Sequence, residues 1–261
     1  SDILPNNTTK KADIFFRHKP KNIEKYGGVF VPGPDIGDFV RQRMYYGHDK
    51  YSLLGVTHTT ASQHVMDGLS SLLTHPVMPW DAVICTSNCV RDTVTKVINS
   101  QKDYLKSKLD AKNFSLPQFP IIPLGVDPDY FEINESSKSS ARKKLNIDQD
   151  DIAIVFVGRL SFHAKSHPFP MYLALEKIQQ DLPNDKKIHL IQTGWFANDH
   201  IKNAFENEAK KICPNINLIF LDGRNQSLKF QSLAASDIFV SLSDNIQETF
   251  GLTPLEGMAS G

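Results

Sequence analysis

Two glutamates, Glu248 and Glu256, stand eight residues apart near the end of the sequence. Gly251, Thr253 and Pro254 lie between them, in a stretch that begins after an apolar run that predicts a strand. Thr253 suits an N-cap and Pro254 suits the first helical position, so a helix should begin here. A helix N-terminus offers backbone N–H groups and a positive dipole end to an anion. The pattern therefore predicts an anion site whose two carboxylates can bind hydroxyl groups of the same ligand.

The glutamates also have a simpler interpretation. Glu256 stands three residues after Thr253 and could be its capping-box partner. Glu248 could be a solvated loop carboxylate. Both interpretations stay open at the level of residue spacing.

Two cations, Arg159 and Lys165, follow Gly158 at the end of a second apolar run. Positive side chains at such a position could neutralise a diphosphate leaving group, whose negative charge grows as a glycosidic bond breaks. The alternative is that both are solvated surface cations.

These stretches resemble the signature of a known family, the retaining GT-B glycosyltransferases of group 1, or family four. Residues Ser243–Gly261 follow the family pattern Ser-x4-Glu-x-Phe-Gly-x3-Leu-Glu-x-Met-Ala-x-Gly, and the main departure is Gly257, where alanine is usual. Gly158-Arg159-Leu160 with a later lysine is similar to the family's diphosphate motif, although the spacing to Lys165 is one residue longer than usual. The resemblance runs from about Leu53 to Gly261.

The resemblance implies a role for each matching residue. Glu248 would contact the transferred sugar and Glu256 the ribose of the donor. Arg159 and Lys165 would lie at the donor diphosphate. The backbone after the Phe-Gly pair would meet the sugar and the diphosphate. The donor-binding residues implied are Glu256, Phe250, Gly251, Leu252, Thr253 and Gly158.

Two further positions match the family less specifically. Gly125 lies in a segment similar to the family's interdomain connection, where it would allow close approach of a ligand. His58 follows a predicted strand at a place where the family often has a histidine near the sugar and acceptor. An ordinary strand-to-turn junction and a structural histidine are the alternatives. With the resemblance, the catalytic residues predicted are His58, Arg159, Lys165 and Glu248.

Short apolar runs alternate with amphipathic stretches, which predicts an α/β fold with parallel strands. The predicted strands are 53–56, 82–85, 120–123, 153–157, 187–192, 217–221 and 238–242. The predicted helices are 60–73, 88–109, 169–181, 200–212 and 228–235, with a short one near 141–145 and a helix start at 255–261. The polar run 135–140 is interpreted as part of a surface connection.

The resemblance implies the GT-B fold, in which two Rossmann-like domains face a cleft. We expect residues 1–125 to form an N-terminal acceptor-side domain and residues 126–261 a C-terminal nucleotide-sugar-binding domain. Both are predicted to be incomplete. No strand with a glycine-rich loop is recognised before Leu53, and the chain ends where a helix has just begun, so we expect the native protein to continue. The segment Ser1–Lys50 is poorly informative.

Composition argues against several other classes of protein. Lys+Arg and Asp+Glu are both 29, whereas nucleic-acid binding normally needs an excess of basic residues. The cysteines, Cys85, Cys89 and Cys213, are too few for a zinc site and predict free thiols in a reducing compartment. There is no run of about 18 apolar residues, and Ser1–Lys11 lacks the apolar core of a signal peptide. We expect a cytoplasmic protein, with peripheral membrane contact left open.

The reaction implied by the resemblance is transfer of a sugar, with retention of anomeric configuration, from a UDP-, GDP- or ADP-sugar. The acceptor would be a carbohydrate or a lipid-linked molecule, in glycan, polysaccharide or glycoconjugate biosynthesis. The family needs no metal and no cofactor, and the departing phosphate is thought to help take the acceptor proton in a same-face attack. Glu248 and Glu256 are therefore assigned to donor binding and not to the acid and nucleophile roles of a glycosidase pair.

Three alternatives share parts of this pattern. A sugar-nucleotide epimerase or a phosphorylase would have the same fold. A nucleotide-sugar-binding fragment without activity would keep the donor site only. The long glutamate signature favours the transferase.

Overall fold

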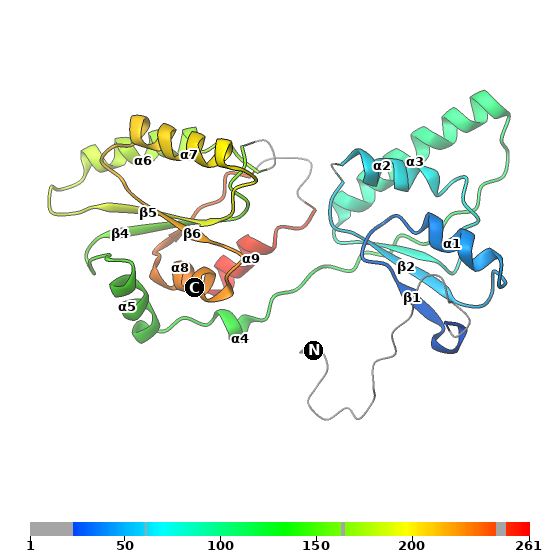
Figure 1. Cartoon of the computed structure of the whole chain (residues 1–261), viewed down its shortest axis with the longest axis horizontal. Coiled ribbons are helices and arrows are strands. Elements are labelled where there is room, and N and C mark those ends of the chain that lie inside the picture. The colour runs from blue at the N-terminus through cyan, green and yellow to red at the C-terminus, as the bar shows by residue number, and fades with distance from the viewer. Residues whose placement is uncertain (1–22, 61, 163–164, 244–248) are drawn as a thin grey trace. The chain divides into compact units, whose positions relative to one another are not determined.

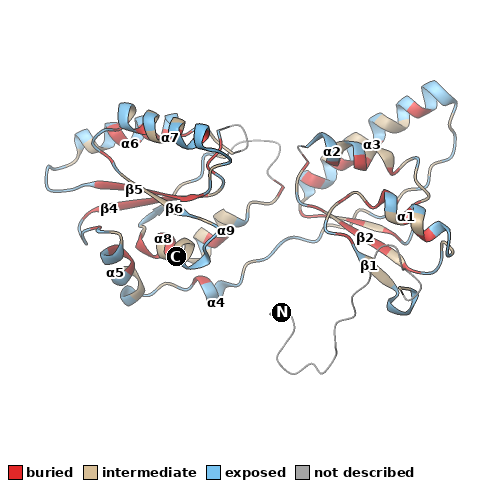
Figure 2. Ribbon diagram, viewed as in Figure 1, coloured by how far each residue is buried: buried red, intermediate tan, exposed pale blue. Residues whose placement is uncertain are grey.

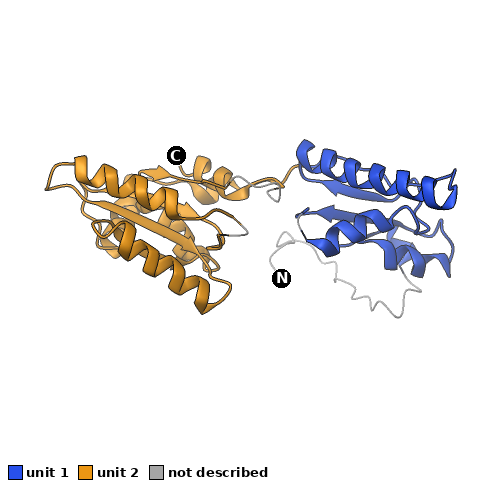
Figure 3. Ribbon diagram, turned by 90° about the horizontal axis from the view of Figure 1, so that it is seen from above, with its two compact units in different colours: residues 1–122 blue, residues 123–261 orange. Residues whose placement is uncertain are grey.

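The computed structural model describes residues 23–60, 62–162, 165–243 and 249–261. The chain divides into two compact units, residues 1–122 and 123–261 (Figure 3). The division falls three residues before the boundary that we place after Gly125. Each unit is built around a parallel sheet.

The first unit contains a three-stranded parallel sheet in the order β1-β2-β3. Its strands are β1 (Gly28–Phe30), β2 (Ser52–Thr57) and β3 (Ala82–Cys85). Its helices are a short 3-10 turn, η2 (Glu24–Tyr26), and α1 (Gly37–Met44), α2 (Gln63–Ser71) and α3 (Asn88–Leu109). Ser62 caps α2 and Ser87 caps α3, each by accepting a hydrogen bond from the residue three positions later.

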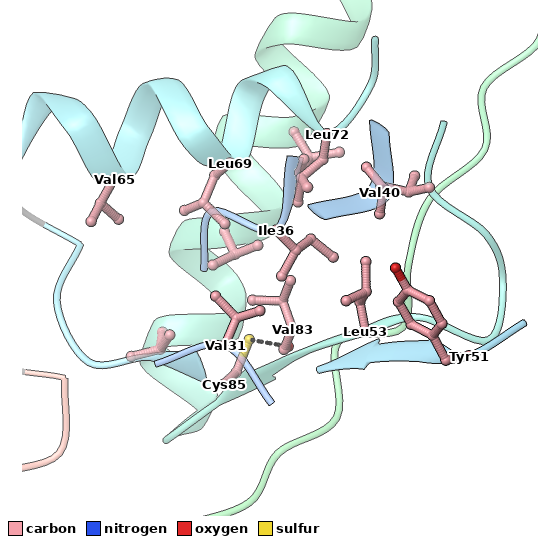
Figure 4. Close-up of a cluster of buried hydrophobic side chains, with 14 residues drawn as sticks. Val31, Ile36, Val40, Tyr51, Leu53, Val65, Leu69, Leu72, Val83 and Cys85 are labelled. Carbon is pink, nitrogen blue, oxygen red and sulfur yellow. Dashed lines mark hydrogen bonds between the residues drawn. The ribbon is translucent and has the colours of Figure 1, made fainter. Parts of the chain in front are cut away.

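Helices pack on one face of this sheet and bury alternate strand residues. Leu53 of β2 and Val83 and Cys85 of β3 point into the core, where Leu69 of α2 and its C-cap residue Leu72 meet them (Figure 4). The strand residues between them are only half-buried. This alternation is what a strand with one covered face shows.

A buried ion pair connects α1 to the start of β3. Arg43 and Asp81 are both fully buried, and the guanidinium donates to both carboxylate oxygens, at 2.5 and 2.7 Å. Asp81 also accepts from the backbone N–H groups of Leu53 and Met78, at 2.9 and 2.8 Å. The carboxylate is thus well supplied with donors, which a buried charge requires.

The second unit contains a four-stranded parallel sheet in the order β6-β5-β4-β7. Its strands are β4 (Ile152–Val157), β5 (Ile188–Gly194), β6 (Asn217–Asp222) and β7 (Ile238–Phe239). Its helices are α4 (Pro128–Phe131), α5 (Glu135–Lys144), α6 (Phe169–Asp181), α7 (Asp199–Ile212), α8 (Gln226–Ala235) and α9 (Leu252–Ala259). Figure 1 shows α6 and α7 over one face, and α5, α8 and α9 over the other.

Both faces of the central strands are therefore covered. On β4, Val155 belongs to the core shared with α8, whereas Ile154 packs with Tyr172 and Leu175 of α6. All seven residues of β5 are buried, as the buried colour of this strand shows (Figure 2). Continuous apolar runs are the expected sequence of such strands.

Glycines let the carboxyl ends of β4, β5 and β6 approach closely. A Cβ built on Gly194 would lie only 1.9 Å from the carbonyl oxygen of Gly158, and one on Gly223 would lie 2.9 Å from the Cα of Gly194. Backbone hydrogen bonds from Gly158 to Thr193 (3.0 Å) and from Gly223 to Gly194 (2.9 Å) continue the pairing to the ends of the strands. The sheet edge at which ligands of such folds bind is thus tightly assembled.

Several predictions about elements are wrong. Residues 120–123 form no strand and make only an isolated bridge between Cys85 and Ile121. The polar run 135–140 belongs to α5, which begins there because Asn134 and Ser137 form a capping box. A strand does precede Leu53: β1 is only three residues long, too short to give an alternating pattern. The strand predicted at 238–242 is confined to two residues.

Candidate functional site

A pocket of about 130 Å³ lies in the second unit, at the carboxyl ends of β4 and β7. From β4 the chain adds β5 and then β6 on one side, and β7 afterwards pairs on the other side. The order of strands therefore reverses between β4 and β7, which is where open parallel sheets bind ligands. The residues that line the pocket come from the end of β4, from the segment after β7 and from the start of α9: Val157, Lys165, Ser241, Ser243, Phe250, Gly251, Thr253 and Pro254.

The N-terminus of α9 contributes to this pocket. The N-cap is Gly251, in the left-handed conformation at φ 85°, and it has no side chain that could cap the helix. Our assignment of Thr253 as the N-cap is wrong, because the helix already begins at Leu252. Pro254 is tolerated at the third helical position since the first backbone N–H groups of a helix have no intrahelical acceptor. The positive end of the helix dipole is thus directed at the pocket wall.

Lys165 brings a cation to the same pocket. Its side chain is half-buried, and Ser241 and Ser243 add hydroxyl groups nearby. A lysine ammonium beside a helix N-terminus is a combination that attracts an anion, and a phosphate binds readily to such an arrangement. The longer spacing after Arg159 does not keep Lys165 away from the α9 residues.

Arg159 lies elsewhere on the same sheet edge. It is exposed and lines a separate hollow of about 10 Å³ with Phe156, Ser166 and Gln192 among its neighbours. This hollow is too small for a ligand group. Arg159 therefore does not join Lys165 in this pocket.

Glu256 is buried behind the start of α9, with a relative exposure of 9%. Its Oε1 accepts a hydrogen bond from Nζ of Lys229 at 2.7 Å. Its Oε2 is buried and has no hydrogen-bond partner among the described residues. The capping-box alternative is wrong, because Gly251, and not Thr253, caps the helix.

The remaining predicted residues are placed as follows. Gly158 and Leu252 adjoin pocket residues without lining the pocket. Gly125 is exposed, and a Cβ added there would meet nothing within 4 Å. His58 follows β2 in the first unit and is exposed. Glu248 lies outside the described residues.

The cysteines are free, as the sequence predicts. Burial raises the pKa of Cys85 to about 11, against the opposing charge of Arg91. Burial, with the nearby charge of Glu176, raises the pKa of Cys213 to about 11 as well. These two thiols are therefore protonated at neutral pH and are not nucleophiles.

Two residues at the site were missed by sequence analysis. The first is Ser241, which stands two positions before Ser243. Alternate residues of an extended segment point the same way, so Ser241 could have been inferred from Ser243, which was noted. Lys229 gave no signal, because a single lysine on an amphipathic helix is usually solvated.

Comparison with known proteins identifies the second unit. Residues 137–261 match the family model "Glycosyl transferases group 1". This part of the chain therefore resembles group 1 glycosyltransferases. The match covers β4 to α9, and so includes the pocket and the Lys229–Glu256 pair.

The chain is similar over 181 residues to an uncharacterised glycosyltransferase, MJ1607, of Methanocaldococcus jannaschii, with 23% identity. The similarity covers 69% of this chain and 40% of that protein. The chain thus spans less than half of the length of this curated relative.

Solved structures share the fold. HepE of Anabaena, determined with UDP and glucose, aligns with a TM-score of 0.61 at 15% identity, over 92% of this chain and 58% of that one. A trehalose-6-phosphate synthase structure, from a study of glycosyl transfer with retention, aligns with a TM-score of 0.63 at 15% identity, over 89% and 56%. The fold of the chain is therefore of the GT-B type, α/β with parallel sheets. In the parts of the chain that the structure describes, no helix is long and apolar enough to span a membrane.

Proposed function

We propose that the protein is a glycosyltransferase that takes a sugar from a nucleotide-sugar donor and binds the donor diphosphate in the pocket beside α9. The observation that carries this proposal is the convergence of Lys165 and the N-terminus of α9, which has glycine as its N-cap, at the β4–β7 switch point. This is an anion site at the edge where parallel sheets bind nucleotides.

The pocket chemistry suits the leaving group of the reaction. When the bond between the sugar and the diphosphate breaks, negative charge builds on the departing phosphate oxygens. The ammonium of Lys165 and the first backbone N–H groups of α9 are fixed donors that stabilise such charge in the transition state. Arg159, on the same sheet edge, is proposed to assist once a donor is bound.

Donor identity is proposed from the relatives. HepE was determined with UDP and glucose, which supports a UDP-sugar as the first candidate. GDP- and ADP-sugars are the other candidates. Glu248 is proposed to contact the transferred sugar, and Glu256 the ribose, as the family signature implies.

Retention of anomeric configuration is also proposed from a structure that shares the fold. The trehalose-6-phosphate synthase was studied for transfer with retention, and it shares the fold. The acceptor is proposed to be a carbohydrate or a lipid-linked glycan, met by the first unit, where His58 lies at a strand end.

The test is a turnover assay with a panel of UDP-, GDP- and ADP-sugars and a mixture of glycan acceptors. Release of a nucleoside diphosphate, together with a glycoside of unchanged anomeric configuration by NMR, is the expected result. Nucleotide sugar epimerised without an acceptor would replace the transferase with an epimerase. Binding without turnover would leave a nucleotide-sugar-binding protein.

A further inference from the structure

Lys229 of α8 and Glu256 of α9 form an ion pair that the family signature does not contain. Nζ of Lys229 donates to Oε1 of Glu256 at 2.7 Å. The two side chains have relative exposures of only 12% and 11%. We propose that Lys229 is a positioning residue, which fixes the carboxylate of Glu256 so that Oε2 accepts a hydrogen bond from the ribose of the nucleotide. This inference rests on the proposed function.

The second carboxylate oxygen of Glu256, Oε2, lacks a hydrogen-bond donor in the described part of the chain. It is buried and has no hydrogen-bond partner among the described residues. An unpaired buried acceptor is costly, whereas a hydroxyl donor that reaches it removes the cost. The pair therefore leaves one oxygen of Glu256 occupied and the other in need of a donor. A ribose hydroxyl is a donor of the right kind.

Lys229 is itself held in place. Its ammonium lies 5.6 Å from the ring centroid of Phe131 on α4, a cation–π contact. Its backbone N–H donates at 3.0 Å to Asn225, which caps α8 through its side chain. Because Lys229 is fixed at both ends, it limits rotation of the Glu256 carboxylate. Without it, the two oxygens of Glu256 would be equivalent, and their direction would be set by the helix alone.

A purely structural brace between α8 and α9 is the competing explanation. Both explanations predict that removing the pair lowers the melting temperature. Only the positioning role predicts a change in how well the protein distinguishes a ribose from a sugar that lacks its hydroxyl groups. The ratio of the two affinities, for the nucleotide with a ribose and for the nucleotide without the ribose hydroxyl groups, is therefore the quantity to measure.

The experiment is calorimetric titration of the 261-residue chain with UDP, GDP and ADP and with their 2′,3′-dideoxy counterparts. Three variants are compared with the unsubstituted chain: Lys229→Met, which keeps the apolar stem, Lys229→Arg, which keeps the charge, and Lys138→Met as a control. Lys138 pairs with Asp237 at 2.8 Å in the same unit, but it does not contact Glu256. Lys138→Met thus removes an ion pair of the same kind from the same unit.

The expected result is that Lys229→Met weakens binding of the ribonucleotide about tenfold, the size of one charge-assisted hydrogen bond, and leaves the dideoxy compound within twofold. The Lys229→Arg variant should keep most of the preference for the ribonucleotide over the dideoxy compound. The Lys138→Met variant should leave that preference unchanged. If Lys229→Met does not fold, Lys229→Gln is measured instead, and its ratio should fall at least threefold.

An unchanged ratio of ribonucleotide to dideoxynucleotide affinity in a folded Lys229→Met or Lys229→Gln variant would overturn the inference. The pair would then be a purely structural contact between α8 and α9. An equal fall in the Lys138→Met control would overturn it as well. If the unsubstituted chain binds none of the three nucleotides, the proposed function itself fails, and the inference fails with it.

Discussion

Two cations, Arg159 and Lys165, follow β4 and lie at different places on the sheet edge. Lys165 reaches the pocket at the N-terminus of α9, whereas Arg159 is exposed beside a neighbouring hollow. Their common position after β4 was visible in the sequence. The path of the loop that follows was not, because side-chain directions in a loop depend on packing with distant segments.

We predict that Lys165→Met weakens binding of a nucleoside diphosphate by about tenfold to a hundredfold, since a hydrogen bond to a charged group contributes about 1.5–3 kcal/mol. Binding of the matching nucleoside should change less than threefold, because it lacks the phosphates. Calorimetry with both ligands measures the difference. Equal losses for nucleoside and diphosphate would place Lys165 away from the phosphates.

We predict that Arg159→Ala lowers turnover much more than it lowers stability. The side chain is exposed, and surface substitutions usually change the free energy of unfolding by less than about 0.5 kcal/mol. Its proposed contact with the leaving diphosphate forms only with donor bound. The turnover number and the melting temperature of the variant are compared with those of the unsubstituted protein. An unchanged turnover number with a large fall in melting temperature would show that Arg159 is structural.

Among the residues, the family resemblance implied Lys165, Phe250, Gly251 and Thr253, and the structure brings these four to one pocket. The partner of Glu256 could not be predicted. Lys229 stands 27 positions earlier in the sequence, and the pair exists only because α8 and α9 pack on the same face of the sheet.

The contact between α9 and β7 explains why glycine stands at position 257. A Cβ on Gly257 would lie 2.8 Å from two carbons of the Phe239 ring, closer than real Cβ contacts allow. The bulky ring of Phe239 thus requires the absence of a side chain at position 257. The departure from the family pattern is a matter of packing between elements.

We predict that Gly257→Ala destabilises the second unit by roughly 1 kcal/mol. Replacing a helical glycine by alanine gains up to about 1 kcal/mol, but overpacking a close contact costs about 1–3 kcal/mol. The double variant Gly257→Ala/Phe239→Leu should be more stable than the sum of the two single changes predicts. Urea unfolding of all four proteins provides the cycle. Additive effects would show that the two residues do not compete for space.

Asp237 links the end of α8 to α5 and β4. Partial burial by itself raises its pKa, but hydrogen bonds from the backbone of Ala153 and from Lys138 and Arg142 outweigh this and hold the pKa below the ordinary 3.8. The carboxylate therefore stabilises the fold fully above about pH 4, and this contribution is lost as the pH falls through the lowered pKa.

We predict that Asp237→Asn is less stable than the unsubstituted chain at pH 7 and that the difference shrinks below pH 3.8. The free energy of unfolding at pH 7 should fall by about 1–3 kcal/mol, because the partners of Asp237 lose a charged acceptor. Urea unfolding at several pH values between 3 and 7 measures the difference. A difference that is constant with pH would mean that the charge of Asp237 does not contribute.

At the level of elements, the sequence predicts long, regular segments well. The bounds of α3, α6 and β3 agree with prediction to the residue, because strong apolar periodicity and clear ends coincide there. The short elements β1 and β7 are set by pairing with neighbouring strands, which single-sequence patterns do not report. The start of α9 was predicted two residues late, at Pro254, because Gly251 in a left-handed conformation takes the place of the expected cap Thr253.

As a whole, the chain consists of two α/β units, each with a parallel sheet, and the second contains the residues that match the group 1 glycosyltransferase model. The candidate anion site, the Lys229–Glu256 pair and the glycine-lined sheet edge all belong to that second unit. Donor binding should therefore be observable there without reference to the first unit.

The most direct test of the central claim follows the backbone amides of the isotope-labelled 261-residue chain by NMR while UDP, GDP or ADP is added. The predicted result is that one of the three diphosphates shifts the amide signals of Lys165, Leu252 and Thr253 in a saturable manner, and that Lys165→Met weakens this response. Saturable binding that leaves these amides unchanged, or no binding of any of the three nucleotides, would contradict the assignment of the pocket beside α9 to the donor diphosphate.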